Sequence, residues 1–306
     1  MKPYPILISR FLLLVASCLA LTHLAVAFLP TGLAQGAELQ NHFYPFNNSM
    51  RRSGPSDPVE QAALLADLGF EGFEGYDMDL LPRLAEELHK RDLEVATIYF
   101  GVDIDSKTQP YDPRIAEYLE TFLKDTGVII TVHLHSKKFL PSEPAGDQSA
   151  IPILRKLSDL AHQHGAKVAV YNHVNFWAES IDDGIRLARK VNRRNFGAAF
   201  NLCHWLALEG GENLNQRLDD IAPYLLSVSI CGAEGGPEAK GAGWNDLIQP
   251  LDTGSFDNLH FLREITKRGY QGPIGLQCFN ISLPARENLT RSMSAWRGFR
   301  ADFEDK

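Results

Sequence analysis

Cysteine and basic charge are both scarce in this chain of 306 residues. Apart from Cys18, which lies in an apolar N-terminal run, the cysteines are Cys203, Cys231 and Cys278. An odd number with no close-spaced pair excludes a disulfide framework and predicts small, buried thiols. Lysine and arginine number 30 against 38 aspartates and glutamates, which gives a net charge of −8. This balance argues against nucleic-acid partners and against attraction to an anionic membrane surface.

Two phosphate-binding signatures are also absent. No G-x-G-x-x-G pattern follows the first predicted strand, which argues against an open dinucleotide-binding sheet. The glycine-rich stretch 232–246 lacks the spacing of a phosphate loop. It is interpreted either as a mobile lid with Trp244 at its tip or as a solvated insertion. No linker or low-complexity tract interrupts residues 40–306, so a single domain is expected.

One long apolar run precedes this domain. A basic start leads into residues 11–29, which carry no charge, and small residues that suit cleavage follow. This layout is typical of a secretory signal. An uncleaved membrane anchor is the main alternative, and a lipoprotein box at 15–18 is a third. We expect an exported protein, periplasmic, secreted or membrane-anchored, with residues 1–37 as signal peptide or anchor and residues 38–306 as the folded domain.

Strand and helix patterns alternate throughout the domain. Leucines recur at helical spacing in 80–91, 153–165 and 256–269, and a last helix is expected at 284–300. Strict alternation implies parallel strands, and eight units in about 250 residues match a closed barrel. The predicted fold class is therefore α/β, a single (β/α)₈ TIM barrel. The expected strands are FYPFN (43–47), FEGFEGY (70–76), EVATIYF (94–100), VIITVHLH (128–135), KVAVYNH (167–173), FGAAFNLC (196–203), LLSVSIC (225–231) and GPIGLQCFN (272–280).

Polar side chains gather at the ends of these strands. Side chains alternate along a strand, so parity predicts which of them face the barrel lumen. In the fourth strand, Val132 and Leu134 suit the helix side, which turns His133 and His135 inward. A lone inward polar residue is ordinarily a hydrogen-bonded core group, whereas many on one face favour a site. The other inward residues predicted are Glu74, Tyr76, Tyr171, His173, Asn201, Ser227, Ser229 and Gln277, with His204 just after the sixth strand.

Four stretches of the chain resemble a known family. They are LADLGFEGFEG (65–75), NLCHW (201–205), GWNDLIQPLDTGSFD (243–257) and RGYQGPIGLQCFN (268–280). Together they look like the xylose isomerase-like barrels of the sugar-phosphate isomerase/epimerase superfamily, over about residues 40–300. The resemblance implies a TIM barrel that acts on a small carbohydrate. It also implies one divalent cation, held by carboxylates and a histidine from strands five to eight.

The resemblance breaks at the metal ligands. The family's Glu, Asp, His and Glu are matched here by Tyr171, Asn201, Ser229 and Gln277. A hard dication must lose bound water when it enters a protein site, and the attraction of charged ligands offsets this cost. Neutral oxygen ligands provide much less of that attraction. We therefore expect no metal ligands by the family pattern and regard the usual divalent metal as doubtful. An ion held by histidines, from the set His133, His135, His173 and His204, is the alternative.

The loop YNHVNFWAES (171–180) occupies the place where the family contacts substrate. Histidine titrates near neutral pH and a carboxylate can be tuned there, so His173, His135 and Glu74 are the predicted catalytic acid/base groups. Aromatic and amide side chains suit a sugar's faces and hydroxyls, although Trp177 and Phe176 have the simpler interpretation of seating the loop. The predicted substrate-binding residues are Tyr171, Asn172, Asn175, Trp177, Glu179, Asn201, His204, Gln277 and Asn280.

Three functions are compatible with these residues. The favoured one is an exported carbohydrate isomerase or epimerase, or a related lyase, that moves a proton on a keto or aldo sugar. The second is a non-catalytic sugar-binding barrel. The third, a phosphodiesterase of the endonuclease IV kind, needs several metals and a basic track for DNA, which this acidic chain lacks.

Overall fold

A computed structural model describes residues 38–304. Eight strands form one parallel sheet in the order β1-β8-β7-β6-β5-β4-β3-β2. The amide of Glu71, just before β2, donates to the carbonyl of Phe43 in β1 at 3.1 Å and joins the two ends of the sheet. The strands are β1 (Phe43–Pro45), β2 (Gly72–Gly75), β3 (Glu94–Asp103), β4 (Ile129–His135), β5 (Lys167–Val170), β6 (Phe196–Asn201), β7 (Leu225–Ile230) and β8 (Ile274–Leu276).

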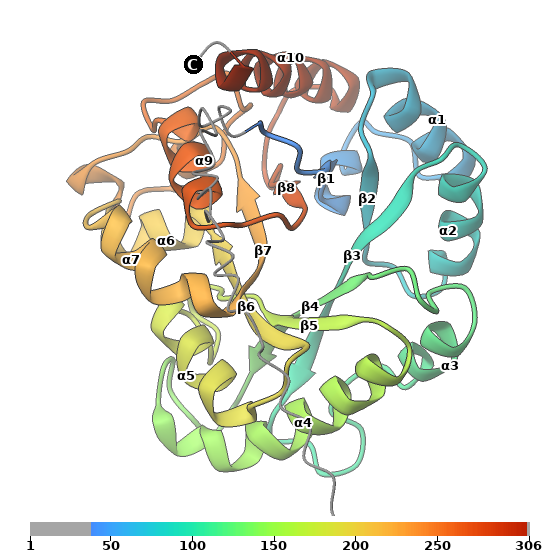
Figure 1. Ribbon diagram of the computed structural model, residues 1–306, viewed down its shortest axis with the longest axis vertical. Helices are drawn as coiled ribbons and strands as arrows, with labels where there is room; N and C mark the ends of the chain where they lie inside the picture. The colour runs from blue at the N-terminus through green and yellow to red at the C-terminus, as the bar shows by residue number, and fades with distance from the viewer. Residues whose placement is uncertain (1–37, 305–306) are drawn as a thin grey trace, which may run out of the picture. The chain divides into compact units, whose positions relative to one another are not determined.

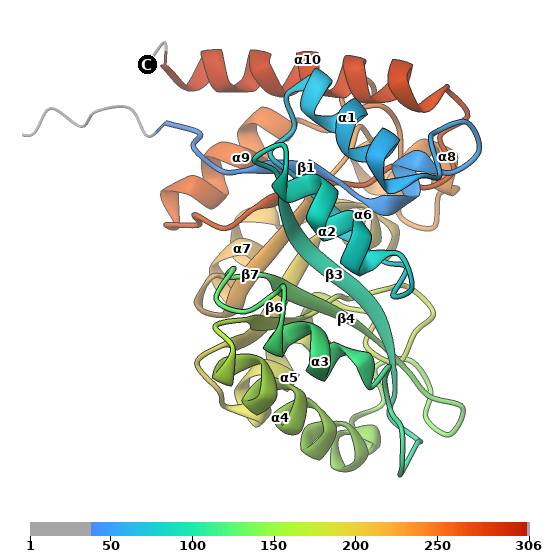
Figure 2. The same cartoon turned by 90° about the vertical axis from the view of Figure 1, so that its right-hand side faces the viewer.

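Helices surround this barrel, as Figures 1 and 2 show. The C-terminal helix α10 lies beside α1 in both views, so the first and last helices of the domain are neighbours. The predicted eight-unit α/β barrel is thereby confirmed. The helices are α1 (Pro58–Leu68), α2 (Leu81–His89), α3 (Arg114–Glu120), α4 (Asp147–Gln163), α5 (Ile181–Val191), α6 (Leu202–Glu209), α7 (Leu214–Ile221), α8 (Trp244–Leu247), α9 (Asn258–Lys267) and α10 (Ala285–Glu304), with a 3₁₀ turn η1 (Asn47–Met50) after β1.

Strand ends differ from the sequence-based expectation. β5 ends at Val170, so Tyr171 and His173 lie in the loop beyond it. α6 begins at Leu202, directly after β6, although the strand was expected to run to Cys203. α4 begins at Asp147, earlier than the leucine spacing predicts. β3, in contrast, runs to Asp103, three residues beyond the expected end. The shorter β5 leaves the polar residues that follow it in a loop at the carboxyl end.

Two apolar cores follow from the alternation of side chains along the strands. Val132 and Leu134 of β4, and their equivalents in other strands, belong to the large core shared with the helices. A smaller cluster fills the lumen. Fully buried apolar area of this kind contributes about 25 cal/mol per Å² to folding. The lumen cluster consists of Tyr44, Phe46, Ala96, Tyr171 and Ala199, with Tyr99 packed against it.

The N-terminal prediction concerns residues outside the described part of the chain. The expected signal peptide or anchor at 1–37 lies wholly there, so it stays a prediction. Among the helices of residues 38–304, none combines the length and the apolar character needed to cross a membrane.

The close approach of β6 and β7 requires glycine at position 197. A Cβ atom there would lie 2.2 Å from the carbonyl oxygen of Tyr224 and 2.7 Å from Cγ of Leu226. Because a backbone carbonyl cannot move aside, we expect Gly197→Ala to lower the free energy of unfolding by about 1–3 kcal/mol. Gly298→Ala is the control, since no heavy atom lies within 4 Å of its Cβ position in α10. Urea denaturation should show the control at or above wild-type stability, and equal losses in both variants would contradict this packing.

Candidate active site at the carboxyl end of the barrel

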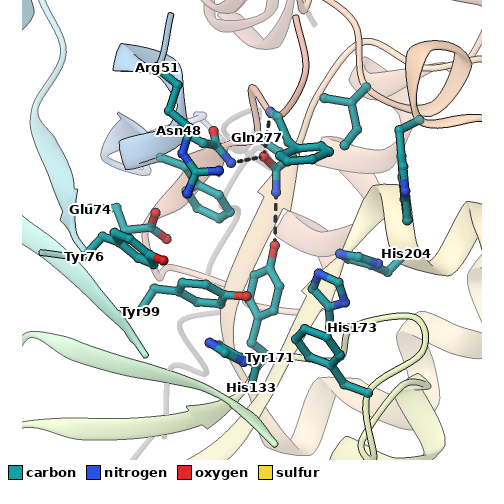
Figure 3. A pocket seen from close by; sticks show the side chains of 15 residues that line it. Asn48, Arg51, Glu74, Tyr76, Tyr99, His133, Tyr171, His173, His204 and Gln277 are labelled. Carbon is teal, nitrogen blue, oxygen red and sulfur yellow. Dashed lines mark hydrogen bonds between the residues drawn. The ribbon is translucent and has the colours of Figure 1, made fainter. Parts of the chain in front are cut away.

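A cavity of about 300 Å³ opens at the carboxyl ends of the strands. Its walls come from the segments that follow β1, β2, β5, β6, β7 and β8, and from β2, β3 and β4 themselves. Figure 3 shows Glu74, Tyr76 and Tyr99 on one side, with His173 and His204 facing them. The lining residues are Phe46, Asn48, Arg51, Glu74, Tyr76, Tyr99, His133, Tyr171, His173, Phe176, His204, Trp244, Ile248, Gln277 and Phe279.

Among the described residues, Glu74 is the only one with a carboxylate that lines this cavity. Its residue is 4% exposed, and its Oε2 atom accepts a hydrogen bond from the backbone amide of Asn47 at 3.1 Å. Burial raises the pKa of Glu74 to about 8, although the Asn47 amide and the charge of Arg51 act in the opposite direction. A carboxyl group in such surroundings is protonated at neutral pH and can donate a hydrogen bond.

His173 and His204 form a pair of neutral imidazoles. The Nδ1 atom of His173 lies 2.9 Å from the carbonyl oxygen of Val174 and donates to it, which leaves Nε2 as the acceptor. The Nδ1 atom of His204 accepts from the Val174 amide at 3.2 Å, which assigns the proton to Nε2. Burial lowers the pKa of both histidines. Their ring centroids are 4.1 Å apart, so the two neutral rings are in contact.

His133 reaches the cavity but His135 does not. The Nε2 atom of His135 lies 2.5 Å from Nδ1 of His133, and the Phe176 ring covers His135 at 4.1 Å between centroids. Burial lowers the pKa of His133 to about 3, so this residue is neutral as well. Both side chains point to the inside of the barrel, as the sequence predicts. The position of His135 nevertheless gives no support to the catalytic role expected for it. His135 stands behind its neighbour, away from the cavity wall.

The four positions matched to the family's metal ligands form two neutral hydrogen-bonded pairs. The Nε2 atom of Gln277 donates to the Tyr171 hydroxyl at 3.2 Å, and its Oε1 atom accepts from Asn48 at 2.5 Å. The Ser229 hydroxyl donates to Oδ1 of Asn201 at 2.9 Å. These donors and acceptors are engaged with one another, and none is ionised, so they do not fit a hard dication.

The histidines do not form a cation cage either. Within residues 38–304, no three histidine, cysteine, aspartate or glutamate side chains are grouped so that they could hold one metal ion. The short contact between His133 and His135 and the backbone contacts of His173 and His204 occupy one nitrogen of each ring. The alternative of an ion held by histidines therefore gains no support from the arrangement.

The loop after β5 contributes to the cavity through its first and middle residues. Phe176 lines the cavity and stacks on His173, with ring centroids 3.9 Å apart. Trp177 is 2% exposed, donates from Nε1 to the carbonyl of Glu143 at 3.0 Å, and has the Arg186 guanidinium 5.7 Å from its ring. Trp177 does not line the cavity, and these contacts fit the simpler of its two interpretations, in which the side chain anchors the loop to neighbouring segments.

Several other predicted contacts lie off the cavity. Asn172 is buried beneath the loop, and its carbonyl accepts from the amide of Asn201, which is itself fully buried. The Asn175 amide donates to the Glu179 carboxylate at 3.1 Å, so these two residues stabilise the loop itself. Asn280 is exposed at the rim, where it bonds Arg52 and Asn245. Of the predicted substrate-binding set, Tyr171, His204 and Gln277 line the cavity.

Some cavity residues were missed or left without a role. Tyr99 is flanked by the outward residues Ile98 and Phe100, so the parity rule applied to β3 finds it. Asn48 and Arg51 belong to η1 and the residue after it, where no strand parity applies. Trp244, expected as a lid tip, contacts His204 edge-on at 5.1 Å between ring centroids.

Comparisons with known proteins agree with this architecture. Structures of similar fold include a 3-keto-D-glucoside 4-epimerase from E. coli, which is 18% identical with a TM-score of 0.65 and covers 86% of this chain and 100% of its own. A D-psicose 3-epimerase from Clostridium cellulolyticum H10 is 14% identical with a TM-score of 0.63, over 86% of this chain and 99% of its own.

A xylose isomerase domain protein from Alicyclobacillus acidocaldarius has a TM-score of 0.67 at 13% identity, over 86% of this chain and 100% of its own. No curated protein matches the chain significantly. The family model described as xylose isomerase-like TIM barrel matches residues 62–298. The resemblance seen in the sequence is thereby confirmed, and the chain belongs to the xylose isomerase-like TIM barrel family.

Proposed function

We propose that this barrel is an enzyme of the sugar isomerase and epimerase type, which moves a proton on a keto or aldo sugar. The observation that carries the proposal is the pairing of a protonated carboxyl group with a neutral imidazole. Glu74 and His173 come from opposite walls of one cavity, and both side chains point into it (Figure 3). An acid and a base on either side of a bound carbon compound are the two groups that proton transfer next to a carbonyl requires.

The reaction follows from the protonation states of these two residues. The Nε2 atom of His173 takes a proton from the carbon beside the carbonyl, and the electrons of that C–H bond move toward the carbonyl oxygen. Glu74 gives its proton to this oxygen, which yields an enediol and leaves Glu74 as a carboxylate. His173 then returns its proton to the neighbouring carbon while Glu74 recovers a proton from the other hydroxyl, so the sugar is isomerised and both groups are restored.

A protonated Glu74 can take over the task that the resemblance assigns to a cation. An enolate oxygen needs an electrophile, and in this family that is expected to be a divalent metal. A carboxylic acid held neutral in an apolar site can instead donate a strong hydrogen bond to the developing oxyanion. We infer that the neutral pairs Tyr171–Gln277 and Asn201–Ser229 replace the metal centre, because their hydrogen bonds satisfy one another.

The remaining walls suit a carbohydrate. Tyr76 and Tyr99 are stacked with centroids 6.2 Å apart, and Phe176 and Trp244 supply further apolar faces. Aromatic faces pack against the C–H groups of a sugar ring, while the amides of Asn48 and Gln277 offer hydrogen bonds. A cavity of about 300 Å³ matches a single sugar unit.

Export belongs to the same proposal. The apolar run at 11–29 after a basic start supports a protein that meets its substrate outside the cytoplasm. Free sugars or glycosides are then more plausible substrates than intracellular sugar phosphates.

The main rival is a non-catalytic sugar-binding barrel, which the neutral hydrogen-bond network favours. A binder needs the aromatic walls and amides but has no use for a protonated Glu74 facing His173. Proton exchange between solvent and bound sugar separates the two, because only an enzyme catalyses it.

Removal of His173 should abolish this exchange. With a panel of keto sugars in deuterated water, we expect His173→Ala to lower the rate of deuterium incorporation by about 100-fold or more, since a general base contributes about 10²–10⁴. Nuclear magnetic resonance of the sugar measures the rate. His260→Ala, which removes an exposed imidazole from α9, is the matched control and should retain the wild-type rate. Wild-type exchange in His173→Ala would remove this residue from the mechanism, and no exchange by wild type on any sugar would favour the binder.

The raised pKa of Glu74 should also appear in the pH dependence of stability. The unfolded chain releases this proton near pH 4.5, whereas the folded protein holds it to about pH 8. Stability from the bound proton is thus full below pH 4.5 and is lost as the pH rises toward 8. Between pH 5 and 8, we expect the free energy of unfolding of wild type to fall by about 2–4 kcal/mol relative to Glu74→Gln.

Urea denaturation at the two pH values measures this difference. Glu120→Gln, at an exposed position of α3, is the control and should follow wild type at both pH values. A constant difference between wild type and Glu74→Gln would show that Glu74 titrates alike in the folded and unfolded chains.

A further inference from the structure

Of the residues in 38–304 that line the cavity, Arg51 alone carries a permanent charge. It follows η1 at the start of the barrel, and its guanidinium points into the cavity beside Asn48 (Figure 3). The guanidinium carbon lies 5.7 Å from the centre of the Tyr76 ring, so the guanidinium group makes a cation–π contact with this ring. Arg51 is an exposed residue, and its five N–H donors form no hydrogen bond with any residue of 38–304.

No carboxylate of residues 38–304 lies within ion-pair distance of Arg51. Several other arginines of this part of the chain are paired with carboxylates, such as Arg114 with Asp112 and Arg268 with Glu264. Others bond neutral groups, such as Arg189, which donates to the Tyr224 hydroxyl. The charge of Arg51 acts on Glu74 through space and opposes the rise of the Glu74 pKa, but the Glu74 carboxyl group accepts its hydrogen bond from the Asn47 amide and not from Arg51. An unpaired guanidinium that faces a partly enclosed cavity is available to a ligand.

The balance of charge in the cavity is opposite in sign to that of the chain. The chain carries a net charge of −8. Of the lining residues, Arg51 is positive, Glu74 is protonated at neutral pH, and burial keeps His133, His173 and His204 neutral. The cavity therefore has a net charge of about +1, and an anionic ligand would compensate it.

We propose that Arg51 binds a carboxylate on the substrate, so that the natural substrate is a sugar acid, such as a uronate, rather than a neutral sugar. This inference rests on the proposed function and specifies its substrate class. A guanidinium fork matches a carboxylate through two parallel N–H···O bonds. One guanidinium with no second cation on the wall balances a single negative charge, whereas a phosphate ester carries close to two.

Arg51 also lies on the same side of the cavity as Glu74, across from His173 (Figure 3). A carboxylate bound there would fix the end of the sugar away from His173. With the carboxylate fixed at Arg51, only the carbon at a matching distance along the sugar can face Nε2 of His173. Arg51 would therefore act as a positioning residue that selects the reacting carbon.

Binding of matched sugars to the full chain tests the proposal. The probes are glucose, glucuronate and glucose 6-phosphate, with the corresponding galactose and mannose sets, and binding is measured by calorimetry. We expect at least one uronate to bind about 10-fold to 100-fold more tightly than its neutral and phosphorylated counterparts, which is the range for one charge-assisted hydrogen-bonded contact. Arg51→Gln should remove this preference, and Arg51→Lys should keep part of it.

Arg52→Gln is the matched control, because it removes the same charge one residue away. Arg52 bonds the exposed Asn280 and does not line the cavity, so the uronate preference should remain in this variant. Neutral sugars that bind as tightly as uronates would overturn the sugar-acid inference and leave the proposed function standing. Tighter binding of the 6-phosphates, or an equal loss for all sugars in Arg51→Gln, would overturn the carboxylate assignment. Failure of every sugar to bind would overturn the proposed function itself.

Discussion

Glu74 is buried at the mouth of the barrel lumen without an ion-pair partner. Within residues 38–304, only the backbone amide of Asn47 donates to its carboxyl group, and Arg51 acts on it through space. Because an unpaired charge is costly in such a site, the proton stays on the carboxyl group at neutral pH. The proposed chemistry depends on this single constraint, since it converts an ordinary acid side chain into a hydrogen-bond donor at the pH where His173 is a base.

The rest of the site is consistent with a cavity that carries no fixed negative charge. The Tyr171 hydroxyl and the Gln277 amide satisfy each other, as do Asn201 and Ser229. Carboxylates at these positions would repel one another without a cation, and would also raise the cost of ionising Glu74 further. The loss of the acidic residues and the protonation of Glu74 are therefore parts of one electrostatic arrangement, in which Arg51 is left as the uncompensated charge.

Much of this architecture could be predicted from the sequence. Apolar and polar residues alternate so regularly in β4 that the lumen position of His133 follows from parity. The same alternation, continued by one residue past the ends of β5 and β8, also gives Tyr171 and Gln277. Parity cannot tell how deep a side chain lies, and for this reason His135 was expected on the cavity wall although His133 and Phe176 stand in front of it. Nor does parity extend into loops, where the φ/ψ angles follow no period. Trp177 is turned into the protein by its bond to Glu143, and Arg51 reaches the cavity from a 3₁₀ turn.

The protonation state of Glu74 is the central claim, and infrared difference spectroscopy measures it most directly. The difference spectrum between wild type and Glu74→Gln isolates the carbonyl stretch of a single protonated carboxyl group. The structure predicts that this band is present at pH 6, falls to half its intensity near pH 8, and is replaced by a carboxylate band above that pH. A carboxylate band already present at pH 6, with no protonated carboxyl band, would contradict the account.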